Sequence, residues 1–173
     1  MDFQGALSGL QEFLDRGGPI LVVIMAATFV MWAFILERLA YFGFAFNGDA
    51  NRAKRLWSAR TDHTSWNAHA IRDQLISEVK QRAEQNVELV KTLVAIAPLL
   101  GLLGTVTGMV QVFDVMAIAG SSDARAMSAG VSRATIPTMA GMVAALSGLV
   151  FSNQIEMMAK RRTARLADQL ELE

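Results

Sequence analysis

The residues of this chain that could act chemically inside a membrane are hydroxyls placed in two long uncharged stretches. Thr105 lies among the 22 residues that separate Lys91 from Asp114, and Thr138 lies among a further 22 that follow Arg133. A hydroxyl donates and accepts hydrogen bonds but does not ionise near neutral pH. Neither stretch contains Asp, Glu, His or Lys, and a proton path across a membrane needs a titratable group. Any acid on such a path must therefore come from another protein.

Small residues accompany both hydroxyls at helical spacing. Gly101 and Gly108 share one helix face with Thr105, a pattern that favours close approach of another helix. In the later stretch small residues recur in steps of four and three, opposite larger apolar side chains. Two interpretations stay open: the two small faces line a common interior that a third object fills, or they simply pack against other helices. The small residues of the later stretch are Ala134, Thr138, Gly141, Ala145, Gly148 and Ser152, and the larger ones are Met142, Leu146 and Leu149.

Two charged residues mark the same end of both stretches. Asp114 ends the first stretch, and Arg133 immediately precedes the second. Either charge could line the entrance of a pore, or its side chain could simply extend into the membrane interface.

Three segments are long and apolar enough to cross a membrane. A hydrocarbon core of about 30 Å needs about 20 apolar residues in a helix. The two stretches meet this length, and residues 17–36 supply a third uncharged run of 20 residues, followed by an aromatic cluster. Nine basic residues lie between positions 38 and 91, and four more lie after the last span. The positive-inside rule then places the N-terminus outside, and the loop at 38–91 and the C-terminus inside.

The elements needed to position the hydroxyls follow from this arrangement. We expect an all-α membrane protein whose three transmembrane helices extend into the cytoplasm as long helices. Proline after two glycines at 17–19 indicates the start of a new helix. An apolar stripe from Ile71 to Val94 predicts a cytoplasmic helix continuous with the second span. The expected segments of this single membrane domain are a periplasmic interfacial helix at 1–16, the first span at 17–42, a cytoplasmic helical region at 43–92, the second span at 93–119, a periplasmic turn at 120–130, the third span at 131–155 and a cytoplasmic tail helix at 156–173.

Several other functions are disfavoured by the sequence. The 16 basic and 16 acidic side chains give no reason to expect nucleic acid, and no cysteine is present for disulfides or thiolate metal sites. His63 and His69 lack neighbouring ligands and are interpreted as surface residues rather than a metal site. The glycine-rich run at 101–108 lacks the lysine of a nucleotide-binding loop. No nucleophile–base pair is recognisable, so we expect neither an enzyme nor a bound cofactor. The acidic N-terminus also disfavours a signal peptide.

Two runs carry a resemblance to a known family. The run APLLGLLGTVTGM at 97–109 and the run GVSRATIPTMAGMVAALSGL at 130–149 resemble the proton-channel family of ExbB, TolQ and MotA. Three spans with an outside N-terminus resemble ExbB and TolQ, whereas MotA-type proteins have four spans. The short length and the wording SRATIPTMAGM resemble ExbB of the smaller, secondary TonB-system type.

The resemblance implies a function and a set of site residues. It implies a pentameric ring in the bacterial inner membrane, whose second and third spans surround the single spans of an ExbD-like dimer. An intramembrane aspartate of that dimer would carry the proton, which agrees with the absence of an acid from the two spans. Proton flow would move the dimer, and this motion would energise TonB-dependent transport. Arg133 departs from the family, which carries glutamate there, so the outer part of the pore must differ. The residues expected to line the pore are Thr105, Thr138, Gly101, Gly108, Gly141, Ala145 and Gly148, with Asp114 and Arg133 at its entrance.

Two alternatives to this function stay open. A TolQ-like subunit would use the same mechanism with a different periplasmic partner, in envelope integrity. A membrane scaffold would assemble other proteins without conducting protons, and only proton dependence separates it from the other two.

Overall fold

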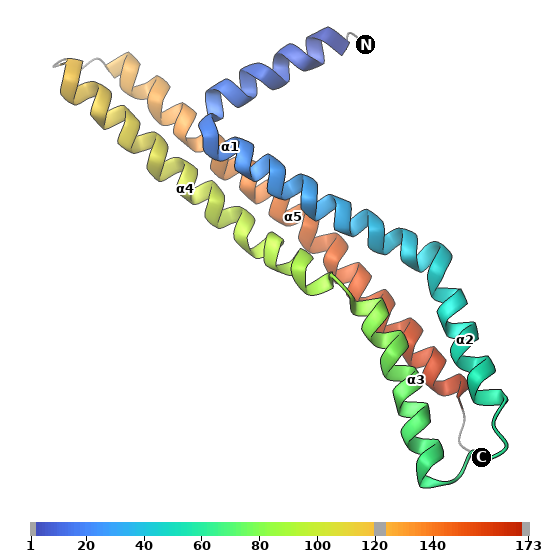
Figure 1. The fold of residues 1–173 in the computed structure, drawn as a ribbon. Coiled ribbons are helices and arrows are strands. Elements are labelled where there is room, and N and C mark those ends of the chain that lie inside the picture. Colours follow the sequence, from blue (N-terminus) through green and yellow to red (C-terminus); the bar gives the residue numbers. More distant parts are fainter. Residues whose placement is uncertain (1–2, 120–123, 171–173) are drawn as a thin grey trace. The chain divides into compact units, whose positions relative to one another are not determined.

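A computed structural model describes residues 3–119 and 124–170, and every regular element in these ranges is a helix (Figure 1). Three of the helices are long and apolar enough to cross a membrane. The predicted all-α class with three apolar spans is therefore confirmed. The elements are α1 (Phe3–Ala40), the π-helical η1 (Tyr41–Ala45), α2 (Phe46–Ser58), α3 (Trp66–Glu84), α4 (Val87–Ala119) and α5 (Ala124–Gln169).

The chain folds as two compact units. The first unit contains residues 1–31 and 92–149, and the second contains residues 32–91 and 150–173. Each unit is therefore built from separate parts of the chain. The division into periplasmic, membrane and cytoplasmic segments stays a prediction.

Helix α1 in the first unit changes direction where the sequence indicates a new helix. Gly18 has φ 68° and ψ −171°, a conformation that is open to glycine and strained for other residues. Pro19 then occupies the first turn of the following helix, where its missing N–H has no partner to lose. Beyond this kink, Leu21 and Ile24 are buried. The predicted helix start is confirmed, and the interfacial position of the preceding helix stays a prediction.

The apolar stripe in the second unit is buried as expected, but its helix is interrupted. Leu75, Val79 and Ala83 on α3 are all less than a tenth exposed. The prediction of one helix running into the second span is wrong, because α3 ends at Glu84 and α4 begins at Val87. The intervening Asn86 has φ 61°, a left-handed conformation that asparagine tolerates better than most residues.

Helix α5 continues without interruption for 46 residues. The predicted tail at 156–173 is therefore helical as far as Gln169, and its cytoplasmic location stays a prediction. The turn predicted at Gly120-Ser121-Ser122-Asp123 lies outside the described residues.

Candidate functional site

Glycines bring α4 and α5 of the first unit into backbone contact. A Cβ built on Gly101 would lie 2.9 Å from the Cα of Thr138, and one built on Gly141 would lie 2.5 Å from the carbonyl oxygen of Ala97. Side chains do not fit at such separations, so only glycine permits this contact. Close packing of small residues is the usual basis of helix association in membranes, where lipid removes the hydrophobic driving force.

The contact extends toward both ends of the hairpin. A Cβ on Gly108 would lie 2.8 Å from the Cβ of Ala134, and Gly148 faces the sulfur of Met31 on α1. Ala145 is also buried. The predicted close approach of another helix is therefore confirmed at these positions, and the helix comes from the same chain. Their assignment to a pore wall stays a proposal.

Both predicted hydroxyls donate to backbone carbonyls. Thr138 Oγ1 lies 2.9 Å from the carbonyl oxygen of Gly101 and links α5 to α4. Thr105 Oγ1 lies 2.8 Å from the carbonyl oxygen of Leu102, within its own helix. Because Gly101 lies beside Thr138, Thr105 is one helical turn, about 6 Å, from the level of Thr138.

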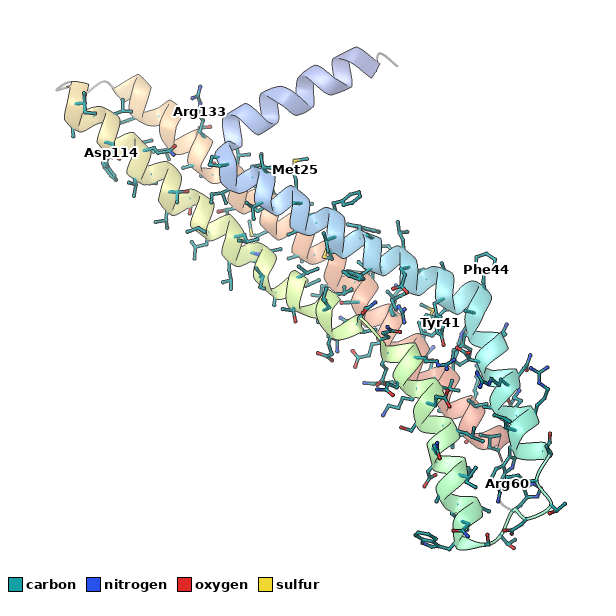
Figure 2. The ribbon with its side chains drawn as sticks, viewed as in Figure 1. Met25, Tyr41, Phe44, Arg60, Asp114 and Arg133 are labelled. Carbon is teal, nitrogen blue, oxygen red and sulfur yellow. The ribbon has the colours of Figure 1, made fainter. Side chains whose placement is uncertain are left out.

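Asp114 and Arg133 are exposed, and neither forms an ion pair with a described residue. Gly108 packs beside Ala134, so Arg133 lies near the level of residue 109. Asp114 is then about five residues, or about 7.5 Å, farther along α4. Figure 2 shows both side chains on the outer surface of the helices. Neither charge is neutralised within the described part of the chain.

Arg133 also borders a groove that the sequence did not predict. The groove has a volume of about 550 Å³ and lies between the kink of α1 and the facing parts of α4 and α5. Gly18 and Pro19 form one wall, and Gln111 contributes an amide. The kink and the small residues of α4 and α5 together leave this space open.

Ionic contacts in the second unit form a cluster that sequence spacing did not reveal. Arg38 is 3% exposed, and its guanidinium donates to the carbonyl oxygen of Arg82 at 2.9 Å and pairs with Glu37. Arg82 in turn pairs with Asp49 at 2.9 Å. These residues come from α1, α2 and α3, and the contact between Arg38 and Arg82 joins positions 44 residues apart in the sequence. The sequence indicated this cluster only by the charged residues that follow the first apolar run, and such charges do not show which residues will pair.

A second ionic cluster joins α4 to α5 within the second unit. Glu156 accepts hydrogen bonds from Lys160 at 2.7 Å and from Lys91 at 2.9 Å. These bonds lower the pKa of Glu156 to about 2. The spacing of four residues predicts the pair with Lys160, whereas the contact with Lys91 depends on the fold.

The described helices and their glycine contact define a helical membrane protein. The model of a family described as the MotA/TolQ/ExbB proton channel family matches residues 45–168, well over half of the chain. The chain therefore belongs to this family, as the two sequence runs predicted. The family is one of transport proteins rather than enzymes.

Several curated proteins are similar to parts of the chain. The ExbB-like 1 protein of Synechocystis is 42% identical over 72 residues, covering 40% of this chain and 28% of that protein. The biopolymer transport protein exbB1 of Vibrio cholerae is 30% identical over 92 residues, covering 53% and 40%. The biopolymer transport protein ExbB of Helicobacter pylori is 32% identical over 71 residues, covering 41% and 49%. The chain thus matches less than half the length of each of these relatives.

Proposed function

We propose that this chain is an ExbB-type subunit of a motor in the bacterial inner membrane that uses the proton-motive force to energise TonB-dependent transport. The observation that carries the proposal is a pair of spans with hydroxyls and no titratable side chain, in a chain of a proton-channel family. A path through such spans needs an acid from a partner. A single-span ExbD-like dimer would supply it, and a TonB-like protein would receive the motion.

The proposed assembly is a homo-oligomeric ring of five subunits, the number that the resemblance to the family implies. Helices α4 and α5 keep large exposed apolar side chains opposite their mutual contact, among them Leu102, Val106, Met142 and Leu146. In the ring these faces meet the neighbouring subunit, the partner spans or lipid. The termini would lie on opposite sides of the membrane, with the N-terminus in the periplasm.

Asp114 and Arg133 form no ion pair with a described residue, and this supports an ion pair between them in neighbouring subunits. Side chains tilt toward the N-terminus of their own helix, and α4 and α5 run in opposite directions. Asp114 therefore leans toward the level of Arg133, and Arg133 leans toward that of Asp114. This tilt reduces their separation in depth of about 7.5 Å. A ring places both residues of neighbouring subunits at fixed depth, so each acid can pair with the arginine of the next subunit.

Cysteine pairing tests the ring directly, because the chain contains no cysteine of its own. A subunit with Asp114→Cys and another with Arg133→Cys, produced together, should be joined into a dimer by a short bismaleimide crosslinker, because a depth difference of about 7.5 Å exceeds the Cα–Cα distance of about 7 Å that a direct disulfide spans. The matched control replaces Asp114→Cys with Leu99→Cys, an exposed position on α4 that lies ten residues, or about 15 Å, from the level of Arg133. Equal crosslinking of the control, or none of the test pair, would contradict the proposed contact.

Proton flux tests the function. Purified protein, with and without an ExbD-like partner, is placed in vesicles with a pH gradient and an internal pH dye. Thr138→Val removes a hydroxyl whose hydrogen bonding contributes about 1 kcal/mol, so flux with the partner should fall about fivefold. Thr105→Val should act in the same direction. Thr107→Val is the control, because Thr107 also bonds its own helix, to the carbonyl oxygen of Leu103 at 2.9 Å.

The results separate the candidate functions. Flux that needs the partner and falls in both threonine variants supports a stator of the ExbB or TolQ kind. Full flux without any partner would refute the need for a foreign acid, and no flux under any condition would favour the scaffold. A TonB homologue or a Tol homologue encoded beside this chain distinguishes the ExbB role from the TolQ role.

A further inference from the structure

The second unit contains a cavity whose charged side chains are all cations. It has a volume of about 520 Å³ and is lined by η1, α2 and the C-terminal part of α5. Its charged residues are Lys54, Arg162 and Arg165. None of these three side chains lies within 4.0 Å of a described carboxylate. The cavity therefore presents three positive charges without a described counterion.

The position of Arg162 is fixed by contacts that leave its charge in place. Its Nη1 donates to the carbonyl oxygen of Phe42 at 2.6 Å. Its guanidinium carbon also lies 5.5 Å from the ring centre of Phe42 and 5.4 Å from that of Phe46. Aromatic faces attract a cation without neutralising it. The guanidinium of Arg162 is thus fixed in position and keeps its positive charge, so it can bind an anion. The rings of Phe42 and Phe46 form an apolar wall of the same cavity.

The cavity begins at the depth of lipid headgroups on the predicted cytoplasmic side. Phe42 lies five residues after Glu37, the first charge after the uncharged run at 17–36, and Arg162 lies six residues after Glu156. These separations correspond to about 7.5 and about 9 Å along a helix. The headgroup layer extends about 5 to 8 Å beyond the hydrocarbon on each side.

An exposed aromatic residue on the same π-helical turn supports this depth. The side chain of Phe44 is 89% exposed, and Figure 2 shows it projecting away from the helices. An aromatic ring exposed next to the end of a span is typical of the membrane interface. Its neighbours Phe42 and Gly43 line the cavity, so the opening lies beside this anchor.

We infer that this cavity binds the phosphate of an anionic phospholipid from the leaflet on its side of the membrane. The guanidinium groups of Arg162 and Arg165 match the oxygens of a phosphate, and Lys54 adds a third charge. Phe42 and Phe46 provide apolar surface for the glycerol and upper acyl part of a lipid, which a free phosphate ion would not use. The inference depends on the predicted spans and not on proton conduction.

Native mass spectrometry of the purified full chain tests this inference. The protein is titrated with phosphatidylglycerol and, separately, with the net-neutral phosphatidylcholine. The variant Lys54→Gln with Arg165→Gln should bind phosphatidylglycerol about thirtyfold more weakly, since each cation near a membrane surface contributes about 1 kcal/mol and 1.4 kcal/mol is tenfold. The control variant Lys80→Gln with Arg161→Gln removes two exposed cations that do not line the cavity, and should bind like wild type.

The alternative outcomes each decide against a part of the inference. Equal weakening in both double variants would show diffuse charge attraction and overturn the site. Equal binding of both lipids would overturn recognition of an anion. Displacement of phosphatidylglycerol by an equal concentration of inorganic phosphate would assign the site to the free ion. Circular dichroism checks the fold, and if the double variant unfolds, Lys54→Gln alone should still weaken binding about fivefold.

Discussion

Replacing Gly141 with alanine should destabilise the contact between α4 and α5. The new Cβ would lie 2.5 Å from the carbonyl oxygen of Ala97 and 3.2 Å from the Cα of Gly101, whereas ordinary contact begins at 3.4 Å. The helices must therefore separate by about 1 Å, because backbone atoms cannot rotate away as a side chain can. Overpacking of this kind costs about 1 to 3 kcal/mol. The clash is with backbone atoms of both Ala97 and Gly101 on α4, which places Gly141→Ala near the upper value.

The expected shift combines this cost with a gain in helix propensity. Alanine favours a helix by about 1 kcal/mol over glycine, which leaves a net loss of about 2 kcal/mol. For a chain of this size, 1 kcal/mol corresponds to about 2 to 4 °C, so the melting temperature followed by far-UV circular dichroism in detergent should fall by about 4 to 8 °C.

Gly48→Ala is the matched control, because a Cβ at Gly48 on α2 would meet nothing within 4 Å. It carries the same gain in helix propensity without a clash, and should raise the melting temperature by about 2 to 4 °C. The reasoning is refuted if Gly141→Ala is as stable as Gly48→Ala. Such a result would mean that α4 and α5 are not in backbone contact at this level.

Three further predictions test other parts of the fold. Asn86→Gly should leave the melting temperature nearly unchanged. Asn86→Val should lower the stability by about 1 to 2 kcal/mol, since φ of 61° is strained for a β-branched residue. Equal melting temperatures of the two variants would argue against the break between α3 and α4. The bonds from Lys160 and Lys91 should stabilise the fold fully above pH about 4.5 and progressively less as pH falls toward about 2, because they lower the pKa of Glu156 to about 2. In Glu156→Gln the melting temperature should therefore depend less on pH in this range. An unchanged pH dependence would contradict the pairing of Glu156 with the two lysines. Arg72→Lys should fray the end of α5. Arg72 donates to the carbonyl oxygens of Leu170 at 2.6 Å and Ala167 at 2.8 Å with two different nitrogens, which one lysine nitrogen cannot replace. Amide hydrogen exchange near residue 167 should be faster in this variant and unchanged in the control Lys80→Arg.

The apolar spans and the small-residue faces were predictable because they depend on local pattern. A helix places residues three and four apart on one face whatever the fold around it. For this reason Gly101, Gly108 and Gly141 lie in the contact that their spacing predicted. Proline after two glycines likewise indicated the kink at Gly18.

The features that were missed depend on single residues or on distant partners. The apolar stripe continues through the break between α3 and α4, so periodicity alone predicted one helix. The break is made by Gln85, with ψ 138°, and by the left-handed Asn86. The ion pair of Lys91 with Glu156 and the contact of Arg162 with Phe42 join residues that are far apart in the sequence. Spacing rules do not reach across such separations, so the cationic cavity could not be predicted from charge counts.

The direction of the hydrogen bonds adds a constraint on the proposed partner. Thr105 and Thr138 both donate their hydroxyl protons to backbone carbonyls, at Leu102 and Gly101. Each oxygen then keeps its lone pairs as acceptors and has no proton left to donate. A neutral carboxylic acid, which has an O–H to donate, fits such acceptors, whereas an ionised carboxylate, which only accepts, does not. In the proposed motor these threonines would therefore favour the protonated form of the partner's acid, because only that form has a proton to donate to them.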